Sequence, residues 1–158
     1  MECYTVIFDS FEWLPHYGEN TIVIHPRKKG CITVDIYYDN NNKVNEQEFP
    51  FAKRSYIFKS VSSFYEGIWS KERGGIDPIS PVTPCKTNAY QPTGVLFEIN
   101  NSLLAKAWDE YRIKNGYKDP IINRHFRQYF WEYPIMIDVI CEDVELTNEI
   151  FLKTEEGE

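Results

Sequence analysis

The spacing of apolar side chains predicts that most of this chain forms β-strands. Short runs rich in β-branched and aromatic residues, bounded by glycine, proline, asparagine or aspartate, are typical of strands. Such runs cover residues 3–9, 21–25, 31–38, 54–58 and 95–99. We expect the second and third runs to pair as a hairpin, because the residues between them include Pro26 and Gly30.

Two segments instead repeat apolar residues every three to four positions, which is the period of a helix buried on one side. The first stripe follows Ser60, a good N-cap, and comprises Val61, Phe64, Tyr65, Ile68 and Trp69. The second follows Asn101, taken as its cap, and comprises Leu104, Ala107, Trp108 and Tyr111. We therefore predict helices over residues 61–71 and 102–114, with Gly74, Gly75, Gly116 and Pro120 as stop signals.

Beyond Gly116 the apolar pattern changes to the two-residue period of a strand. Residues 124–131, 135–142 and 144–152 then read as an antiparallel meander, with a tight turn at residues 132–134. A chain of 158 residues has room for one hydrophobic core. The predicted fold class is α+β: a single domain over residues 1–152 that joins a largely antiparallel sheet of about six to eight strands to two packed helices. Residues 153–158 form an acidic, solvated tail in this prediction.

A stretch of proline-rich sequence separates the two predicted helices. Residues 76–94 include Pro78, Pro81, Pro84 and Pro92 and show no pattern of helix or strand. A connection of this length is either a packed binding element or a functionally mobile loop. It is therefore an alternative place for a binding site.

Negative charge is concentrated at the end of the chain. Residues 132–158 hold nine acidic side chains and one base, a net charge of −8, whereas the whole chain has −7. On the predicted strands, Asp138 and Glu142 share one face, as do Glu145 and Glu149. Such a surface can meet a positively charged partner, although it can equally be the solvated side of a sheet. The acidic balance argues against binding of nucleic acid.

We predict that these four carboxylates bind a basic protein partner. Large aromatic side chains are common at the centres of protein interfaces. Trp131 and Tyr133 adjoin the acidic strands and are the expected aromatic contacts. The predicted partner-binding residues are Trp131, Tyr133, Asp138, Glu142, Glu145 and Glu149.

No sequence motif predicts catalysis, a metal site or a cofactor. The chain has neither a glycine-rich phosphate loop nor a nucleophile elbow nor paired zinc ligands. A pair of acidic side chains could serve in acid–base chemistry, and Cys85 could pair with a histidine, but no local signature supports either. His125, among aromatic residues on a predicted strand, is expected to be packed and hydrogen-bonded.

The cysteines and the N-terminal sequence predict a cytoplasmic protein. Cys3, Cys31, Cys85 and Cys141 are widely scattered, so we expect them to be reduced and free of metal, with Cys85 the most reactive. The first residues lack the basic and apolar regions of a signal peptide. No apolar run is long enough to span a membrane.

The order of the predicted elements resembles small bacterial immunity proteins, such as those of contact-dependent growth inhibition. It runs from short N-terminal strands and the Ser60-capped helix, through residues 90–94 (YQPTG) and the apolar strand 95–100 (VLFEIN), to a helix and the acidic meander. The resemblance implies a non-enzymatic antidote that caps a basic nuclease toxin. The alternatives are a small-molecule enzyme with a pocket under residues 76–94, or a regulatory subunit. The oligomeric state remains open.

Overall fold

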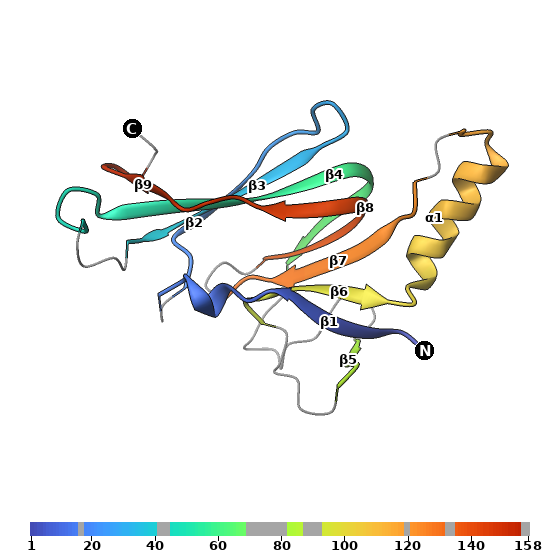
Figure 1. Cartoon of the computed structure of the whole chain (residues 1–158), viewed down its shortest axis with the longest axis horizontal. Coiled ribbons are helices and arrows are strands. Elements are labelled where there is room, and N and C mark those ends of the chain that lie inside the picture. Colours follow the sequence, from blue (N-terminus) through green and yellow to red (C-terminus); the bar gives the residue numbers. More distant parts are fainter. Residues whose placement is uncertain are drawn as a thin grey trace.

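The computed structural model describes residues 1–15, 18–40, 45–68, 82–86, 93–118, 121–131 and 135–155. Its strands belong to one nine-stranded sheet in the order β2-β3-β4-β8-β7-β6-β1-β5, with β9 paired to β4 (Figure 1). The strands are β1 (Cys3–Phe8), β2 (Thr21–Ile24), β3 (Ile32–Asp39), β4 (Phe51–Ile68), β5 (Thr83–Pro84), β6 (Leu96–Asn100), β7 (Arg124–Tyr129), β8 (Ile135–Leu146) and β9 (Ile150–Leu152). A 3-10 helix (Ser10–Glu12) and the α-helix α1 (Leu103–Lys114) are the helices of the described residues.

The predicted hairpin of the second and third strands is confirmed. β2 and β3 pair antiparallel, and Lys28 and Cys31 exchange backbone hydrogen bonds across the turn. The two residues between them, Lys29 and Gly30, have φ values of 51° and 78°. Positive φ at both central positions is the geometry of the tight turn that matches strand twist, and Gly30 adopts it without steric cost.

The predicted helix over residues 61–71 is wrong, because residues 61–68 continue strand β4; residues 69–71 lie outside the described part of the chain. Ser60 has a φ of 52°, and the register with β8 shifts between Val61 and Ser63. These two irregularities place Phe58, Val61 and Phe64 against the same core at intervals of three residues. A strand with a kink and a bulge thus reproduced the spacing of a helix.

The predicted meander is correct for its first two strands only. β7 and β8 pair antiparallel, with Arg124 opposite Cys141 and Tyr129 opposite Met136. β8 then continues through residue 143 to Leu146, and β9 pairs with β4 instead of β8. The sequence suggested a break because Cys141 and Val144 both contact the core, which a regular strand does not allow.

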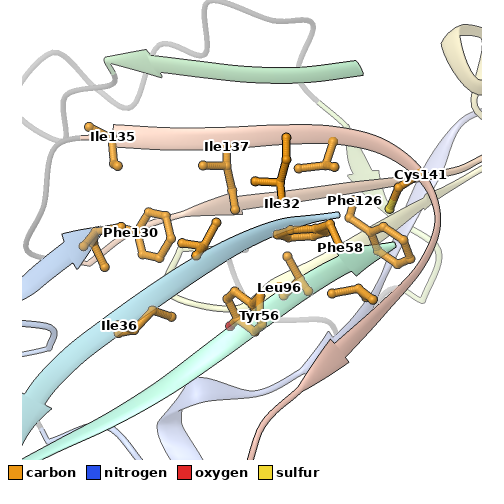
Figure 2. Close-up of a cluster of buried hydrophobic side chains, with 14 of the residues drawn as sticks. Ile32, Ile36, Tyr56, Phe58, Leu96, Phe126, Phe130, Ile135, Ile137 and Cys141 are labelled. Atoms are coloured by element: carbon orange, nitrogen blue, oxygen red, sulfur yellow. The ribbon is translucent and has the colours of Figure 1, made fainter. Parts of the chain in front are cut away.

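The main hydrophobic core lies on the inner face of this bent sheet. Side chains of β3 and β4 meet those of β7 and β8 across it (Figure 2). Its fully buried members include Val34, Ile36, Tyr56, Phe58, Leu96, Phe126, Ile137 and Val139. The long strands β4 and β8 contribute to both sides of the core because they bend, so one sheet encloses its own interior.

A smaller cluster occupies the opposite face of the sheet. It contains Tyr4, Phe97, Ile99, Tyr129 and Met136. Strand alternation places His125, Arg127 and Asp138 on this same face. Both faces of β7 and of the first half of β8 are therefore buried, as their exposure confirms.

The predicted second helix is confirmed as α1, although its N-cap is Ser102 and not Asn101. Ala105 is its one fully buried residue. The described residues thus form a sheet-rich fold with a single α-helix, and the α+β prediction is correct for the sheet but not for the pair of packed helices. No helix in the described ranges has the length and apolar character needed to cross a membrane.

The prediction of four reduced cysteines is wrong. Cys3 and Cys85 form a disulfide, whereas Cys31 and the buried Cys141 are free. Parallel pairing of β1 with β5 sets Cys3 opposite Thr83 and so brings Cys85 within reach, although the two cysteines are 82 positions apart. Burial raises the pKa of the Cys141 thiol to about 12. Because Cys85 is oxidised in the disulfide with Cys3, it is not a reactive thiol.

Candidate functional site: an acidic surface and a buried histidine network

Three of the four predicted carboxylates lie at the surface, near the C-terminal end of β8. Glu142 and Glu145 are exposed on that strand, together with Asp143, and Glu149 is exposed just before β9. We call Glu142, Asp143 and Glu145 the acidic surface. β7 ends its pairing at Cys141, so residues 142–146 have a partner strand only on the β4 side among the described residues.

Basic side chains compensate part of this negative charge. Lys59 Nζ lies 2.9 Å from a carboxylate oxygen of Glu145. Arg124 contacts Asp143 at 2.9 Å and Glu98 at 2.7 Å, and these carboxylates raise the pKa of its guanidinium. Glu142 makes no ion pair with any described residue. Net negative charge therefore remains, although less than the sequence suggests.

Glu149 is held by a hydroxyl group from the core. The Tyr38 hydroxyl donates a hydrogen bond to the Glu149 carboxylate. Burial is the main cause of the strongly raised pKa of Tyr38, and the bond to Glu149 adds to it. The tyrosine thus stays protonated and holds the Glu149 carboxylate on the core side of the sheet.

Asp138 does not belong to the acidic surface, and its burial argues against the predicted role in partner binding. Its exposed fraction is 4%, because the second face of β8 is covered and not solvated. His125 Nε2 lies 2.7 Å from Asp138 Oδ1, and Arg127 Nε donates to the same oxygen at 2.8 Å. Burial opposes ionisation of this carboxyl, but His125 and Arg127 overcome it and lower the pKa of Asp138.

The same network fastens α1 to the sheet. Ser102 Oγ lies 2.7 Å from His125 Nδ1 and also accepts a hydrogen bond from the Ala105 backbone N–H at 3.1 Å. One chain of polar contacts therefore runs from the cap of α1 through His125 on β7 to Asp138 on β8. His125 is packed and hydrogen-bonded, as its sequence context predicts.

The serine, histidine and aspartate of this network are the residue types of a catalytic triad, but their arrangement suits a structural role. A nucleophilic hydroxyl must reach a substrate. Ser102 is 5% exposed and its oxygen caps a helix. The network instead places a buried arginine, Arg127, beside the carboxylate that neutralises it.

Trp131, one of the two predicted aromatic contacts, is not beside the acidic surface. Trp131 is half-buried, with its ring 5.8 Å from that of Phe11. Trp131 directly follows Phe130, whose backbone N–H donates a hydrogen bond to Ile135 at the start of β8. Glu145, by contrast, is near the end of that strand. Ten residues of strand span about 33 Å, so the two sites are far apart. Tyr133 lies outside the described residues.

Sequence reasoning missed the pairing of Arg127 with Asp138. The two residues are directly opposite each other in the β7–β8 register. A signal existed, because a hairpin that turns at residues 132–134 brings these positions together. Ser102 carried no comparable signal, since its contact with His125 depends on how α1 packs against the sheet.

Comparison with known proteins gives no independent assignment. No family model matches the chain, and neither a curated protein nor a solved structure matches it. Within the described ranges, no group of three or more histidine, cysteine or acidic residues could hold a metal ion.

Proposed function

We propose that this protein is a non-catalytic inhibitor of the immunity type, which binds a basic protein partner through the acidic surface. The observation that supports the proposal most strongly is the position of these carboxylates. They are exposed around a strand segment that has no described partner strand on the side away from β4, and Glu142 makes no ion pair with a described residue. A basic toxin domain is the partner that the resemblance to immunity proteins implies.

Exposed carboxylates at an interface act mainly on the rate of association. They attract the opposite charge over about one Debye length, roughly 8 Å at physiological ionic strength. The energy of the contact must therefore come from apolar groups. Ile150, on β9 directly after Glu149, is a large apolar side chain that is exposed to solvent. Ile150 therefore replaces Trp131 as the expected apolar contact.

The same charges have a simpler interpretation. Charged side chains on an unpaired strand edge prevent that edge from pairing with other chains. In that case, reversal of their charge would leave partner binding unchanged, because lysine prevents edge pairing as glutamate does. Measurement of binding kinetics separates the two roles.

The test begins with co-purification from the native host and identification of the bound protein. With that partner purified, association rates are measured at low and moderate salt for wild type and for Glu142→Lys with Glu145→Lys. Glu46→Lys with Glu48→Lys is the matched control, because both glutamates are exposed in a distant turn. We expect a slower association, by about tenfold at low salt, for the first variant only. Equal rates for the two double variants would refute the proposal.

The disulfide changes the expected location of the protein. Disulfides persist in oxidising compartments and are rare in the cytosol. The cytoplasmic assignment depended in part on reduced cysteines, and the Cys3–Cys85 bond removes that part of its basis. We therefore place the inhibitor in an oxidising compartment as part of this proposal. Quantification of free thiols on protein from the native host tests this placement. Cys31 and Cys141 are the free cysteines of the structure, so free thiols at Cys3 and Cys85 as well would contradict it.

A further inference from the structure

A pocket lies between α1 and the turn that joins β2 to β3, over residues 60–62 of β4. Its volume is about 280 Å³. Its walls combine two arginines, Arg27 and Arg112, with three aromatic side chains of the α1 region, Trp108, Tyr111 and Tyr117. Ser60 and Ser62 contribute the floor on β4. A concave site with aromatic walls and a few charged groups is the usual form of a small-molecule site.

The charge of this pocket is opposite to that of the protein as a whole. Neither Arg27 nor Arg112 makes an ion pair with any described residue, although the chain has a net charge of −7. The guanidinium of Arg112 lies 4.7 Å from the centre of the Tyr117 ring, and its Nε is buried without a hydrogen-bond partner. A buried donor without an acceptor is costly, so this group is ready to bind an anion.

The aromatic walls are surfaces that the fold leaves uncovered. The sequence predicts that Leu104, Trp108 and Tyr111 pack into the core, yet Leu104 is 44% and Tyr111 51% exposed. Trp108 is half-buried and its ring lies 5.6 Å from that of Tyr111, edge to face. A planar ligand can stack on such rings.

Hydrogen bonds hold the walls of the pocket in place. Ser62 Oγ donates to Asn123 Oδ1 at 2.8 Å, and Asn123 in turn donates to Asp109 on α1 at 2.8 Å and 3.0 Å. On the other side, the Val61 backbone N–H donates to the Gly30 carbonyl at 2.8 Å. The helix and the turn are therefore both tied to β4, and the site is preorganised for a ligand.

We infer that this pocket binds a small anionic aromatic molecule, whose phosphate or carboxylate contacts Arg27 and Arg112 while its ring stacks on Trp108 and Tyr111. Guanidinium groups bind both kinds of anion through paired hydrogen bonds. The volume of about 280 Å³ lies just below the usual range for ligand pockets, which begins at about 300 Å³, so the site suits a small ligand. This inference is independent of the acidic surface.

Calorimetric titration of the full chain with four probes tests the inference. Adenosine monophosphate and indole-3-acetate carry an anion and a ring, adenosine lacks the anion, and inorganic phosphate lacks the ring. We expect saturable binding of at least one of the first two, with affinity about tenfold higher than for the last two. Binding of adenosine monophosphate alone would indicate a phosphate ligand with a purine nucleoside, and binding of indole-3-acetate alone a carboxylate ligand with an indole-sized ring. No binding of either at millimolar concentration would overturn the inference, as would equal affinity for adenosine or for phosphate.

Variants then locate the site. Arg112→Met and Arg27→Met should each weaken binding of the successful probe by about tenfold. Lys106→Met is the matched control, because Lys106 is exposed on the same helix and does not line the pocket. Circular dichroism checks that Arg112→Met is folded, and Arg27, exposed on a turn, provides a second variant. Unchanged affinity in both arginine variants, or equal weakening by Lys106→Met, would place the ligand elsewhere.

Discussion

The two halves of β8 carry acidic residues that differ completely in environment. Asp138, in the first half, is buried between His125 and Arg127. Glu142 and Glu145, in the second half, are exposed. Only a few residues of the same strand separate these three side chains. The difference shows that a carboxylate's role depends on whether the second face of its strand is covered.

The cause of this difference is the length of the neighbouring elements. β7 pairs with β8 from Met136 to Cys141 and no further. Ser102, the N-cap of α1, bonds to His125 and so covers this same region. The second half of β8 keeps β4 as its one described neighbour. The first half is therefore part of the folded core, whereas the second half is available for contact with a partner.

The largest expected effect is that of Asp138→Asn. The substitution removes the buried carboxylate that both His125 and Arg127 contact, so we expect a loss of about 3–5 kcal/mol in the free energy of unfolding at neutral pH. Urea denaturation followed by circular dichroism measures it. Glu142→Gln is the control, with a change within about 0.5 kcal/mol. If both variants lose the same free energy, the two halves of β8 do not differ as the structure indicates.

The disulfide gives a second test of the covered region, because β1 contributes Tyr4 to the cluster on that face. Cys3→Ser with Cys85→Ser should lower the free energy of unfolding by about 2–4 kcal/mol, since the bond restricts the unfolded chain. Cys31→Ser is a control that leaves the bond intact. Labelling of the denatured, unreduced protein should modify two of its four cysteines. Labelling of all four would show that the bond is absent.

The pH dependence of stability should also distinguish the two halves. The pKa of Asp138 is lower in the folded state than in the unfolded chain. Its carboxylate therefore stabilises the fold above the unfolded pKa of about 3.9, and this contribution is lost as pH falls through the folded value. The stability gap between wild type and Asp138→Asn should narrow between neutral pH and about pH 3. A gap that stays constant over this range would argue against the ion pairs.

The sequence predicted the elements whose pattern is local and regular. The β2–β3 hairpin, α1 and the β7–β8 hairpin follow from turn residues, a cap signal and alternation. The second half of β4 was mistaken for a helix because its kink at Ser60 and its register shift change the apolar spacing from two to three. Local periodicity cannot distinguish these cases, since the irregularity appears only in pairing with β8.

The candidate sites were less predictable, because burial is a property of the assembled sheet. The exposure of Glu142, Glu145 and Glu149 agrees with their charge. Asp138 has the same chemistry and a similar sequence context, yet the cover on its face comes from residues distant in the chain. The pairing of Cys3 with Cys85 depends in the same way on the position of β5 beside β1.

The smallest expected effect is that of the surface ion pair in the exposed half. Lys59 and Glu145 are 46% and 53% exposed, so water and salt screen their attraction and ordering two long side chains opposes it. In a double-mutant cycle with Lys59→Met and Glu145→Gln, we expect a coupling near the limit of detection at low salt and none at moderate salt. The urea midpoints of the four proteins measure it. A coupling that persists in salt, like that expected between Arg127 and Asp138, would mean that the exposed half of β8 is also part of the structural framework, and it would then be a poorer candidate for partner binding.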